Sequence, residues 1–368
     1  PKGRQPGIRG KRSPLDHPLC THAVPVISRS IPTEYRIPVK FVLITMYEPD
    51  GDQPGEFQYF REAEALRKTH DLPAGAFDIW TNDRGLFGLI VGVGAAKSSA
   101  SMMAFGLDPR FDLSQAYFMI SGICGINPGV ASLGSVVWAD YCVDGDLAHE
   151  IDLREAPEDW ETGIFPIGGF APFESVERGR KTLFLPEEVY QLNQRLSTWA
   201  LNLTKDIDLS DLDSPEMARY RSRYEGFPEA QRPPFTLKGD NLGMTRYWHG
   251  EKINAWAEKW VAFWTEGKGR FATSTMEDNG TLRALTQLAK AGIVDWDRVM
   301  LLRTGSNYTM QAPDGQSALE SFRGDGGGGE TMFPGYLPSL RSLQRAGSAV
   351  IAEIVNNWDQ YAKNPPAR

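Results

Sequence analysis

The sequence has few cysteines, few histidines and no long apolar stretch. Its 368 residues include 3 cysteines, an odd number without CxxC spacing, which excludes a disulfide scaffold and a zinc ribbon. The 5 histidines lie far apart without an HxxxH pair, so we predict no metal site. No run of about 18 apolar residues occurs, and the apolar stretches present are too short to span a bilayer. We therefore expect a soluble chain that is not itself a channel or carrier.

Basic residues are scarce beyond the N-terminal stretch. Residues 1–40 hold eight Lys and Arg against two acidic residues, and the remaining 328 residues carry a net charge of −14. Such an acidic body disfavours nucleic acid as a partner, although a single local anion pocket remains open. Residues 1–36 are also rich in proline and lack hydrophobic periodicity or the apolar core of a signal peptide, so we predict a basic, flexible arm.

The rest of the chain alternates short apolar strands with amphipathic helices. We predict strands at 39–47, 76–81, 86–93, 116–123, 134–141, 235–239, 270–274 and 298–304, and helices at 57–66, 95–106, 186–201, 250–264, 280–291 and 337–360. This order predicts a three-layer α/β/α sandwich around a central mixed, largely parallel sheet. We expect one domain over residues 37–368, with insertions near 205–234 and 321–335 that form surface excursions or lids.

Two glycine-rich segments follow predicted strands. Gly94, Lys97 and Ser98 belong to a strand-to-helix turn whose amides and helix dipole favour an anion, although the turn matches neither the P-loop nor the dinucleotide fingerprint. Ser121 and Gly122 open the second segment, where glycine lets backbone approach a ligand. A purely structural turn and a packing requirement are the alternative interpretations.

Chemically richer side chains follow two later strands. Met276, Glu277 and Asp278 come after one strand, and Asn307 after the next. Because the ends of parallel strands meet on one rim, these side chains can converge in a single pocket. Taken alone, Glu277 could be a helix N-terminal carboxylate, and Asn307 a turn residue.

Aromatic residues cluster just before the helix predicted at 250–264. Tyr247 and Trp248 have rings able to stack on a planar base, and core packing is the competing interpretation.

Taken together, these segments resemble the purine nucleoside permease family, whose members are similar to the nucleoside phosphorylase and nucleosidase superfamily. The resemblance covers roughly residues 37–361. Five blocks carry it in the correct order: GVGAAKSSAS, ISGICGINPGVASLGSVV, GDNLGMTRYWHG, TMEDNGTLRAL and RTGSNYT. It implies a nucleoside phosphorylase-like fold.

The resemblance also implies roles for the residues singled out above. Met276 would pack under the ribose, Glu277 would accept hydrogen bonds from its hydroxyls, and Asn307 would hold the imidazole side of the purine. An Asn can donate a hydrogen bond but delivers no proton, which hints at 6-oxopurines. The further substrate-binding residues implied are Asp278, Asp240, Ser121, Gly122 and Tyr247 or Trp248, and the phosphate-binding residues are Gly94, Lys97 and Ser98.

The implied activity is cleavage of the N-glycosidic bond of purine nucleosides, and phosphorolysis to free base and ribose 1-phosphate is the leading alternative. Only Lys97 lies near the proposed phosphate turn, and Arg84, Arg303 or another cation would have to converge on it, so hydrolysis by water stays open. The alternative function is that of a non-catalytic protein that binds nucleosides as a component of nucleoside uptake. We expect purine nucleoside and phosphate as the partners, with phosphate as co-substrate and no cofactor, and a homo-oligomer is compatible with the sequence. The residues leave the compartment open, and the resemblance favours an extracytoplasmic location at the periplasm or cell surface.

Overall fold

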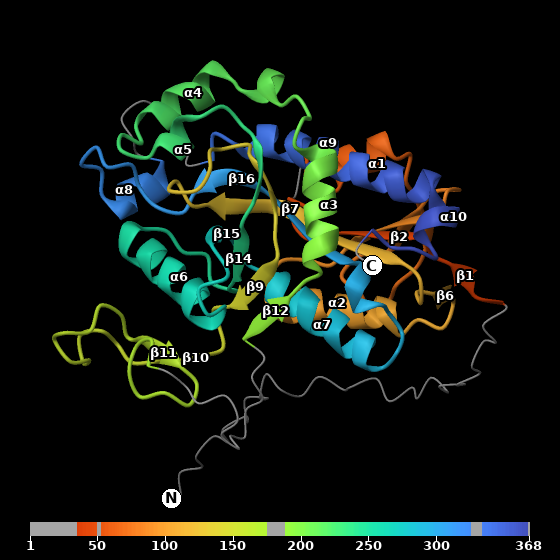
Figure 1. The fold of residues 1–368 in the computed structure, drawn as a ribbon, viewed down its shortest axis with the longest axis horizontal. Coiled ribbons are helices and arrows are strands. Elements are labelled where there is room, and N and C mark those ends of the chain that lie inside the picture. The colour runs from red at the N-terminus through yellow and green to blue at the C-terminus, as the bar shows by residue number, and fades with distance from the viewer. Residues whose placement is uncertain (1–34, 50–52, 175–187, 325–332, 367–368) are drawn as a thin grey trace, which may run out of the picture.

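The structure, a computed structural model, describes residues 35–49, 53–174, 188–324 and 333–366. The arm predicted over residues 1–36 lies almost entirely outside this part of the chain. Within the described residues, twelve strands form one mixed sheet, and helices cover both of its faces (Figure 1).

The central sheet runs in the order β12-β9-β14-β15-β7-β2-β5-β4-β3 and branches at β7, which also pairs with β16. Strand β16 in turn pairs with β8, and β8 with β13. The strands of this sheet are β2 (Phe41–Thr45), β3 (Arg67–His70), β4 (Ile79–Thr81), β5 (Leu86–Ile90), β7 (Tyr117–Ile126), β8 (Val136–Trp138), β9 (Tyr141–Asp144), β12 (Val189–Gln191), β13 (Thr236–Lys238), β14 (Asp240–Gly243), β15 (Phe271–Thr275) and β16 (Val299–Tyr308).

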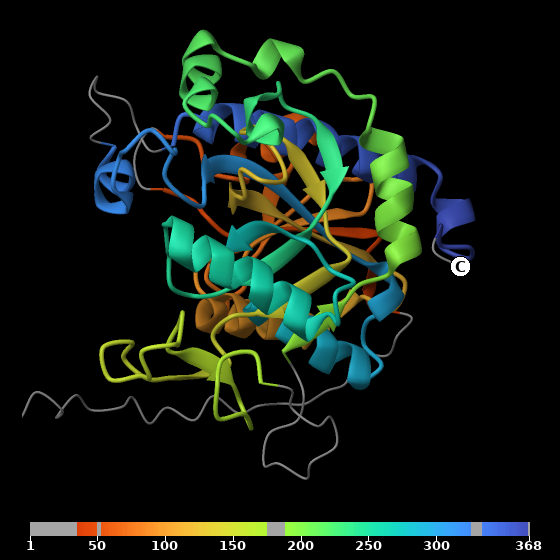
Figure 2. The ribbon, with the colours of Figure 1, turned by 60° about the vertical axis from the view of Figure 1, so that its left-hand side comes forward.

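The middle of the sheet is parallel. Strand β7 runs parallel to β2 and β16, and β5 continues this direction beyond β2. Antiparallel pairings appear where β15 meets β7, where β16 meets β8 and towards both ends of the sheet. Two small sheets lie apart, β1 (Ile37–Pro38) with β6 (Phe111–Asp112), and β10 (Ala148–Glu150) with β11 (Ile164–Pro166). Figure 2 shows the β10–β11 pair well away from the central sheet.

Two helical layers sandwich the sheet. Helices α2 and α7 bury Phe105 and Leu285 against one face, together with Ile44 of β2. Helices α1, α3 and α9 bury apolar side chains such as Phe60 and Ile351 against the opposite face. The helices are α1 (Gln58–Ala63), α2 (Ala95–Gly106), α3 (Gln194–Thr204), α4 (Pro215–Ser222), α5 (Pro228–Gln231), α6 (Glu251–Trp264), α7 (Asp278–Lys290), α8 (Ala318–Arg323), α9 (Tyr336–Asn356) and α10 (Trp358–Tyr361), with the 3₁₀ turns η2 (Ser210–Leu212) and η3 (Trp296–Arg298).

The predicted three-layer α/β/α architecture with a mixed sheet is confirmed. Several boundaries differ. The helix predicted over 186–201 begins only at Gln194, because Val189–Gln191 pairs with β9 as strand β12 and the Asn193 side chain then caps α3. The strand predicted over 134–141 is divided into β8 and β9. The last predicted strand, 298–304, continues to Tyr308.

Both predicted insertions contact the rest of the protein. The segment 205–234 forms α4 and α5, and Met217, Tyr220 and Tyr224 are buried against Tyr308 at the end of β16. It is therefore a packed layer and more than a surface excursion. Of the second segment, residues 325–332 lie outside the described part of the chain, whereas Phe333 and Pro334 line a cavity.

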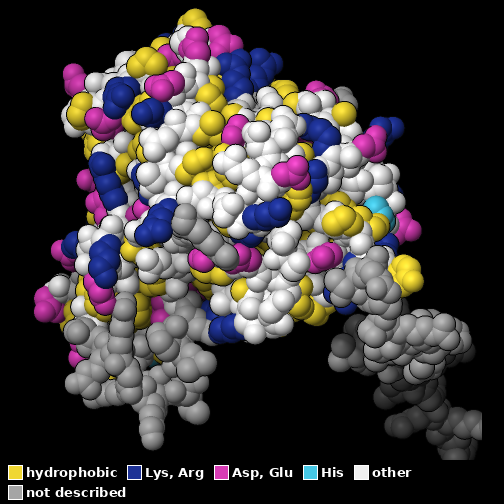
Figure 3. Space-filling model, turned by 45° about the vertical axis from the view of Figure 1, so that its right-hand side comes forward, with side chains coloured by type: hydrophobic (Ala, Val, Ile, Leu, Met, Phe, Trp, Pro, Cys, Tyr) yellow, Lys and Arg dark blue, Asp and Glu magenta, His cyan; other side chains and the backbone are white. Residues whose placement is uncertain are grey.

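Charged side chains of both signs, dark blue and magenta, are scattered among polar and hydrophobic ones over the face drawn in Figure 3. In the part of the chain that the structure describes, no helix combines the length and the apolar character needed to cross a membrane.

Candidate functional site

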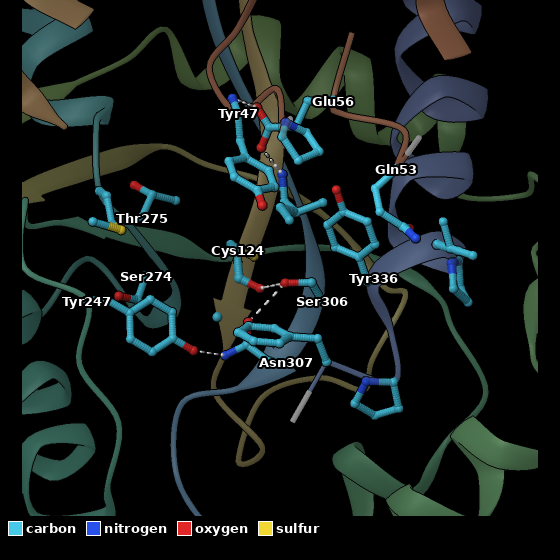
Figure 4. A pocket seen from close by; sticks show the side chains of 18 of the residues that line it. Tyr47, Gln53, Glu56, Cys124, Tyr247, Ser274, Thr275, Ser306, Asn307 and Tyr336 are labelled. Carbon is cyan, nitrogen blue, oxygen red and sulfur yellow. Dashed lines mark hydrogen bonds between the residues drawn. The ribbon is translucent and has the colours of Figure 1, made fainter. Parts of the chain in front are cut away.

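A cavity of about 820 Å³ opens where β2, β7, β15 and β16 end. Strand β15 leads into Met276 and Glu277, and β16 contributes Ser306 and Asn307. The loop after β2 and the start of α9 close other sides. The converging ends of strands thus place side chains from distant parts of the sequence around one space (Figure 4).

Glu277 lies at the junction between β15 and α7. It is the N-cap residue of α7 by position, but its carboxylate makes no capping hydrogen bond and lines the cavity instead. Two contacts fix its backbone: the Ser98 hydroxyl of α2 donates to the Glu277 carbonyl at 3.0 Å, and Gly280 lies against Ala95 so closely that a Cβ would come within 2.1 Å of the Ala95 carbonyl oxygen. A glycine at 280 therefore lets the first turns of α2 and α7 meet beside the cavity.

Arg303 of β16 lies behind the cavity, and only 1% of its side chain is exposed. Its Nε and Nη2 atoms donate to the two carboxylate oxygens of Asp278, and Nη2 also donates to Glu277 at 3.3 Å. Glu56 approaches Nη1 at 3.9 Å. The guanidinium lies over Gly122 of β7, where a Cβ would come within 2.2 Å of Nη1. One cation is thus shared by three buried carboxylates.

Glu56 comes from the loop between β2 and α1 and lines the cavity. Its Oε2 accepts from the backbone amides of Met46 and Tyr47 at 2.9 and 3.0 Å, and its Oε1 accepts from the amide of Ile123 at 2.8 Å. Three backbone donors hold the carboxylate in a fixed orientation and leave one acceptor position on Oε1.

Two of the glutamates that line the cavity, Glu277 and Glu56, hold a proton more readily than a solvated glutamate. Burial raises the pKa of Glu277 to about 8, with Arg303 opposing the shift and the negative charges of Asp278 and Glu56 adding to it. Burial likewise raises the pKa of Glu56, against the opposing effects of Arg303 and the backbone donors. Raised pKa values at a cavity wall are typical of groups that exchange protons during a reaction.

Asn307 occupies another wall of the cavity. The register between β16 and β7 shifts between Gly305 and Asn307, and this bulge lets the consecutive residues Ser306 and Asn307 both face the cavity. The Asn307 side chain donates to the hydroxyl of Tyr247 at 2.9 Å and accepts from the hydroxyl of Ser306 at 2.9 Å (Figure 4). Tyr247 precedes α6 and also lines the cavity.

The structure therefore brings together four of the predicted site residues, Met276, Glu277, Asn307 and Tyr247. Asp278 is fully buried and contacts Arg303 and Asn241, so it orients Arg303 and does not line the cavity.

The remaining predicted substrate-binding residues lie elsewhere. The carboxylate of Asp240 accepts from the amides of Asp140, Tyr141 and Arg270, which ties neighbouring strands together away from the cavity. Trp248 packs against Phe271 in the cluster beneath α6.

Strand β7 lines the cavity, but not with the predicted residues Ser121 and Gly122. Cys124 lines the cavity, whereas the hydroxyl of Ser121 is buried and has no partner among the described residues. Gly122 has no side chain, which lets the guanidinium of Arg303 lie against its backbone.

The predicted phosphate turn lies next to the cavity but does not line it, apart from Val93. Gly94 has a φ of 91° and immediately precedes α2. Lys97 is exposed, and its aliphatic chain lies over Gly92. The hydroxyl of Ser98 donates to the backbone carbonyls of Ala95 and Glu277.

Sequence reasoning missed two features of the site. Glu56 follows a turn-rich segment without any motif, and its position depends on contacts with β7 and β16. The sequence suggests Arg303 only as a possible phosphate-binding cation, whereas the structure surrounds it with carboxylates.

The chain belongs to the purine nucleoside permease family, whose model matches residues 38–366. A protein of Schizosaccharomyces pombe described as a probable purine nucleoside permease is 34% identical over 281 residues, which cover 74% of this chain and 76% of that one. A purine nucleoside permease of Candida albicans is 31% identical over 281 residues, 75% of this chain and 65% of that one. The chain thus spans just under two thirds of the length of this Candida relative.

Two solved structures show a distant similarity. The futalosine hydrolase of Helicobacter pylori is 12% identical, with a TM-score of 0.49 over 86% of this chain and 98% of that one. The 5'-methylthioadenosine/S-adenosylhomocysteine nucleosidase of Neisseria meningitidis, in complex with methylthio-immucillin-A, is 14% identical, with a TM-score of 0.46 over the same shares. Identities this low and TM-scores below 0.5 support no transfer of activity to this chain.

Proposed function

We propose that this protein cleaves the N-glycosidic bond of purine nucleosides and that water is the nucleophile. One observation carries the proposal: a single cavity has Glu277 and Glu56, both in contact with Arg303, on one wall and the Asn307–Tyr247 pair on another. The family and the descriptions of the relatives supply the substrate class, a purine nucleoside.

In the proposed complex the ribose lies against Met276 and Glu277, and the base lies at Asn307 and Tyr247. Breaking the bond between C1' and N9 leaves positive charge on the sugar and negative charge on the purine. Carboxylates near the sugar and hydrogen-bond donors near the base stabilise these charges where they develop.

The charges around the cavity favour water over phosphate. Among the described residues that line it there is no Lys or Arg. Arg303, just behind the wall, already shares its charge among Asp278, Glu277 and Glu56. A phosphate dianion would meet the three glutamates of the lining, Glu56, Glu216 and Glu277, without a lining cation to neutralise its charge, whereas a neutral water can donate a hydrogen bond to these carboxyl groups.

Glu56 is suited to act as the general base. Water attacks C1' through its oxygen while its proton passes to the Glu56 carboxylate, and the electron pair of the breaking C1'–N9 bond goes to the purine. The purine takes up one proton from solvent and Glu56 releases its proton to solvent, so the products are free base and ribose and the carboxylate is regenerated. The raised pKa of Glu56 brings it closer to the range in which a carboxylate accepts a proton efficiently.

Purified protein incubated with inosine, guanosine and adenosine, with and without phosphate, tests the proposal. We expect release of free purine at the same rate in both conditions. Release only when phosphate is present would overturn water as the nucleophile. No release from any nucleoside in either condition would overturn the proposal that the protein is a nucleoside-cleaving enzyme.

Phosphorolysis is the second candidate, and one observation favours it. The N-terminal end of α2 lies beside the cavity through Val93, so phosphate as co-substrate could use the amides near Gly94. Nucleoside binding without turnover, which suits the names of the relatives, is the third outcome that the same experiment separates.

A further inference from the structure

We propose that the hydroxyl of Tyr247, and not the amide of Asn307, is the hydrogen-bond donor to N7 of the purine. This inference rests on the proposed placement of the base at this wall of the cavity. It makes Tyr247 a substrate-contacting residue and Asn307 the residue that positions it.

The hydrogen bonds around Asn307 determine which way its side-chain amide faces. Its Nδ2 atom donates to the backbone carbonyl of Tyr308 at 3.1 Å and to the hydroxyl of Tyr247 at 2.9 Å. Its Oδ1 atom lies 2.9 Å from the hydroxyl of Ser306, whose one hydrogen is shared between this oxygen and the Cys124 carbonyl at 3.1 Å. The reverse orientation would place Oδ1 against the Tyr308 carbonyl, which can only accept, so the orientation with both Nδ2 hydrogens engaged is favoured.

Asn307 consequently has no hydrogen left to offer a ligand. An amide nitrogen carries two hydrogens, and both are used within the protein. What remains on this side chain is acceptor capacity on Oδ1. A purine N7 is itself an acceptor, so Asn307 cannot bind it without first breaking one of these hydrogen bonds.

Tyr247 is in the complementary situation. Its hydroxyl oxygen accepts from Asn307, so its own hydrogen points elsewhere, and no acceptor for it occurs among the described residues. The ring packs edge-on against Phe322 and Phe333, with centroids 5.8 and 6.3 Å away, and the side chain lines the cavity. The structure thus presents one oriented, unused donor at the base-binding wall.

The phenol keeps its proton across the physiological pH range, because burial raises the pKa of Tyr247 above its usual value. A neutral phenol that accepts from Asn307 is polarised by that hydrogen bond, which makes its own hydrogen a better donor. N7 is the unsubstituted imidazole nitrogen that gains charge when C1'–N9 breaks. A donor at N7 therefore helps the purine to leave.

The role of Tyr247 is tested by comparing the Kd of inosine with that of 7-deazainosine, in which a CH group replaces N7. We expect the wild type to bind inosine roughly tenfold more tightly, as one uncharged hydrogen bond allows. Tyr247→Phe keeps the ring and removes the donor, so it should bind both ligands equally. Its turnover of inosine should fall about a hundredfold if the wild type is active, the usual loss for one donor to a developing charge.

Tyr190→Phe is the matched control, because the buried hydroxyl of Tyr190 has no partner among the described residues and lies on β12, outside the cavity lining. It should keep the preference for inosine. A preference that persists in Tyr247→Phe, or its absence from the wild type, would overturn the assignment of Tyr247. Binding with this preference but without turnover would overturn only the proposed enzymatic activity.

Discussion

Arg303 and Asp278 form a two-pronged ion pair that is sealed from solvent. Nε and Nη2 of the arginine donate to Oδ2 and Oδ1 of the aspartate, and the side chains are 1% and 0% exposed. Asp278 opens α7 directly after Glu277, so the pair joins the first turn of α7 to β16. The geometry of the cavity wall depends on this junction, because Arg303 also contacts Glu277 and Glu56.

The first prediction concerns this ion pair. Asp278→Asn leaves the guanidinium of Arg303 with weaker partners inside the protein, and the loss of one member of a buried pair costs about 3–5 kcal/mol. We expect a clear decrease in the free energy of unfolding, measured by denaturant titration. Asp211→Asn is the control, because the Asp211–Arg345 pair is exposed and its loss should change stability little. Equal effects of the two substitutions would contradict the structural role of Asp278.

The second prediction separates function from stability at Glu277. Glu277→Gln resembles the protonated carboxyl group, the form that the raised pKa favours near pH 7, so the free energy of unfolding should change little. The amide is a poorer acceptor for the ribose hydroxyls, and kcat/KM for inosine should fall about a hundredfold or more. Thermal unfolding and steady-state kinetics measure the two effects. Unchanged kcat/KM would remove Glu277 from the site.

The third prediction follows from the pKa of Glu277, raised from 4.5 to about 8 by burial. Because the folded protein holds this proton more tightly than the unfolded chain, the contribution of Glu277 to stability falls as pH rises from 4.5 to 8. Ionised Glu277 is the better acceptor for ribose, so kcat/KM should rise over the upper part of the same range. Profiles of kcat/KM and of Tm against pH test whether activity rises and stability falls as Glu277 ionises. Glu277→Gln should remove the part of each pH dependence that comes from Glu277. A kcat/KM that falls as Glu277 ionises would contradict the role of its carboxylate.

The fourth prediction concerns the proposed general base. Glu56→Gln cannot take the proton of water, so we expect kcat to fall by about two to four orders of magnitude while KM changes much less. Because its NH₂ group must face a backbone amide from which Glu56 accepts, thermal unfolding checks that the variant stays folded. Glu48→Gln is the control, since Glu48 lies on the same loop, accepts from the Phe57 amide and does not line the cavity. Comparable kcat values for Glu56→Gln and the wild type would exclude Glu56 as the base.

The sheet could be predicted where local pattern determines it. The apolar run that contains Phe41–Thr45 is buried at every position, as a central strand requires. The start of α3 could not be predicted from the sequence, because Val189–Gln191 forms a strand only through its pairing with β9. The local sequence pattern does not indicate this contact. The length of β16 was missed for a similar reason, since polar residues up to Tyr308 pair with β7.

The site was predictable where it follows strand ends and unpredictable where it depends on distant contacts. Met276, Glu277 and Asn307 stand next to strands in the sequence, and the structure gathers them around one cavity. Glu56 and the orientation of Asn307 depend on amides, hydroxyls and a guanidinium contributed by other segments. The family resemblance implies Asp240 as a substrate-binding residue, yet backbone amides satisfy its carboxylate.

The measurement that tests water as the nucleophile most directly is the chemical identity of the sugar released from inosine in phosphate buffer, observed by phosphorus and carbon NMR. The charge distribution around Glu56, Glu277 and Arg303 predicts free ribose, with the inorganic phosphate signal unchanged. Accumulation of ribose 1-phosphate in proportion to the hypoxanthine released would contradict it.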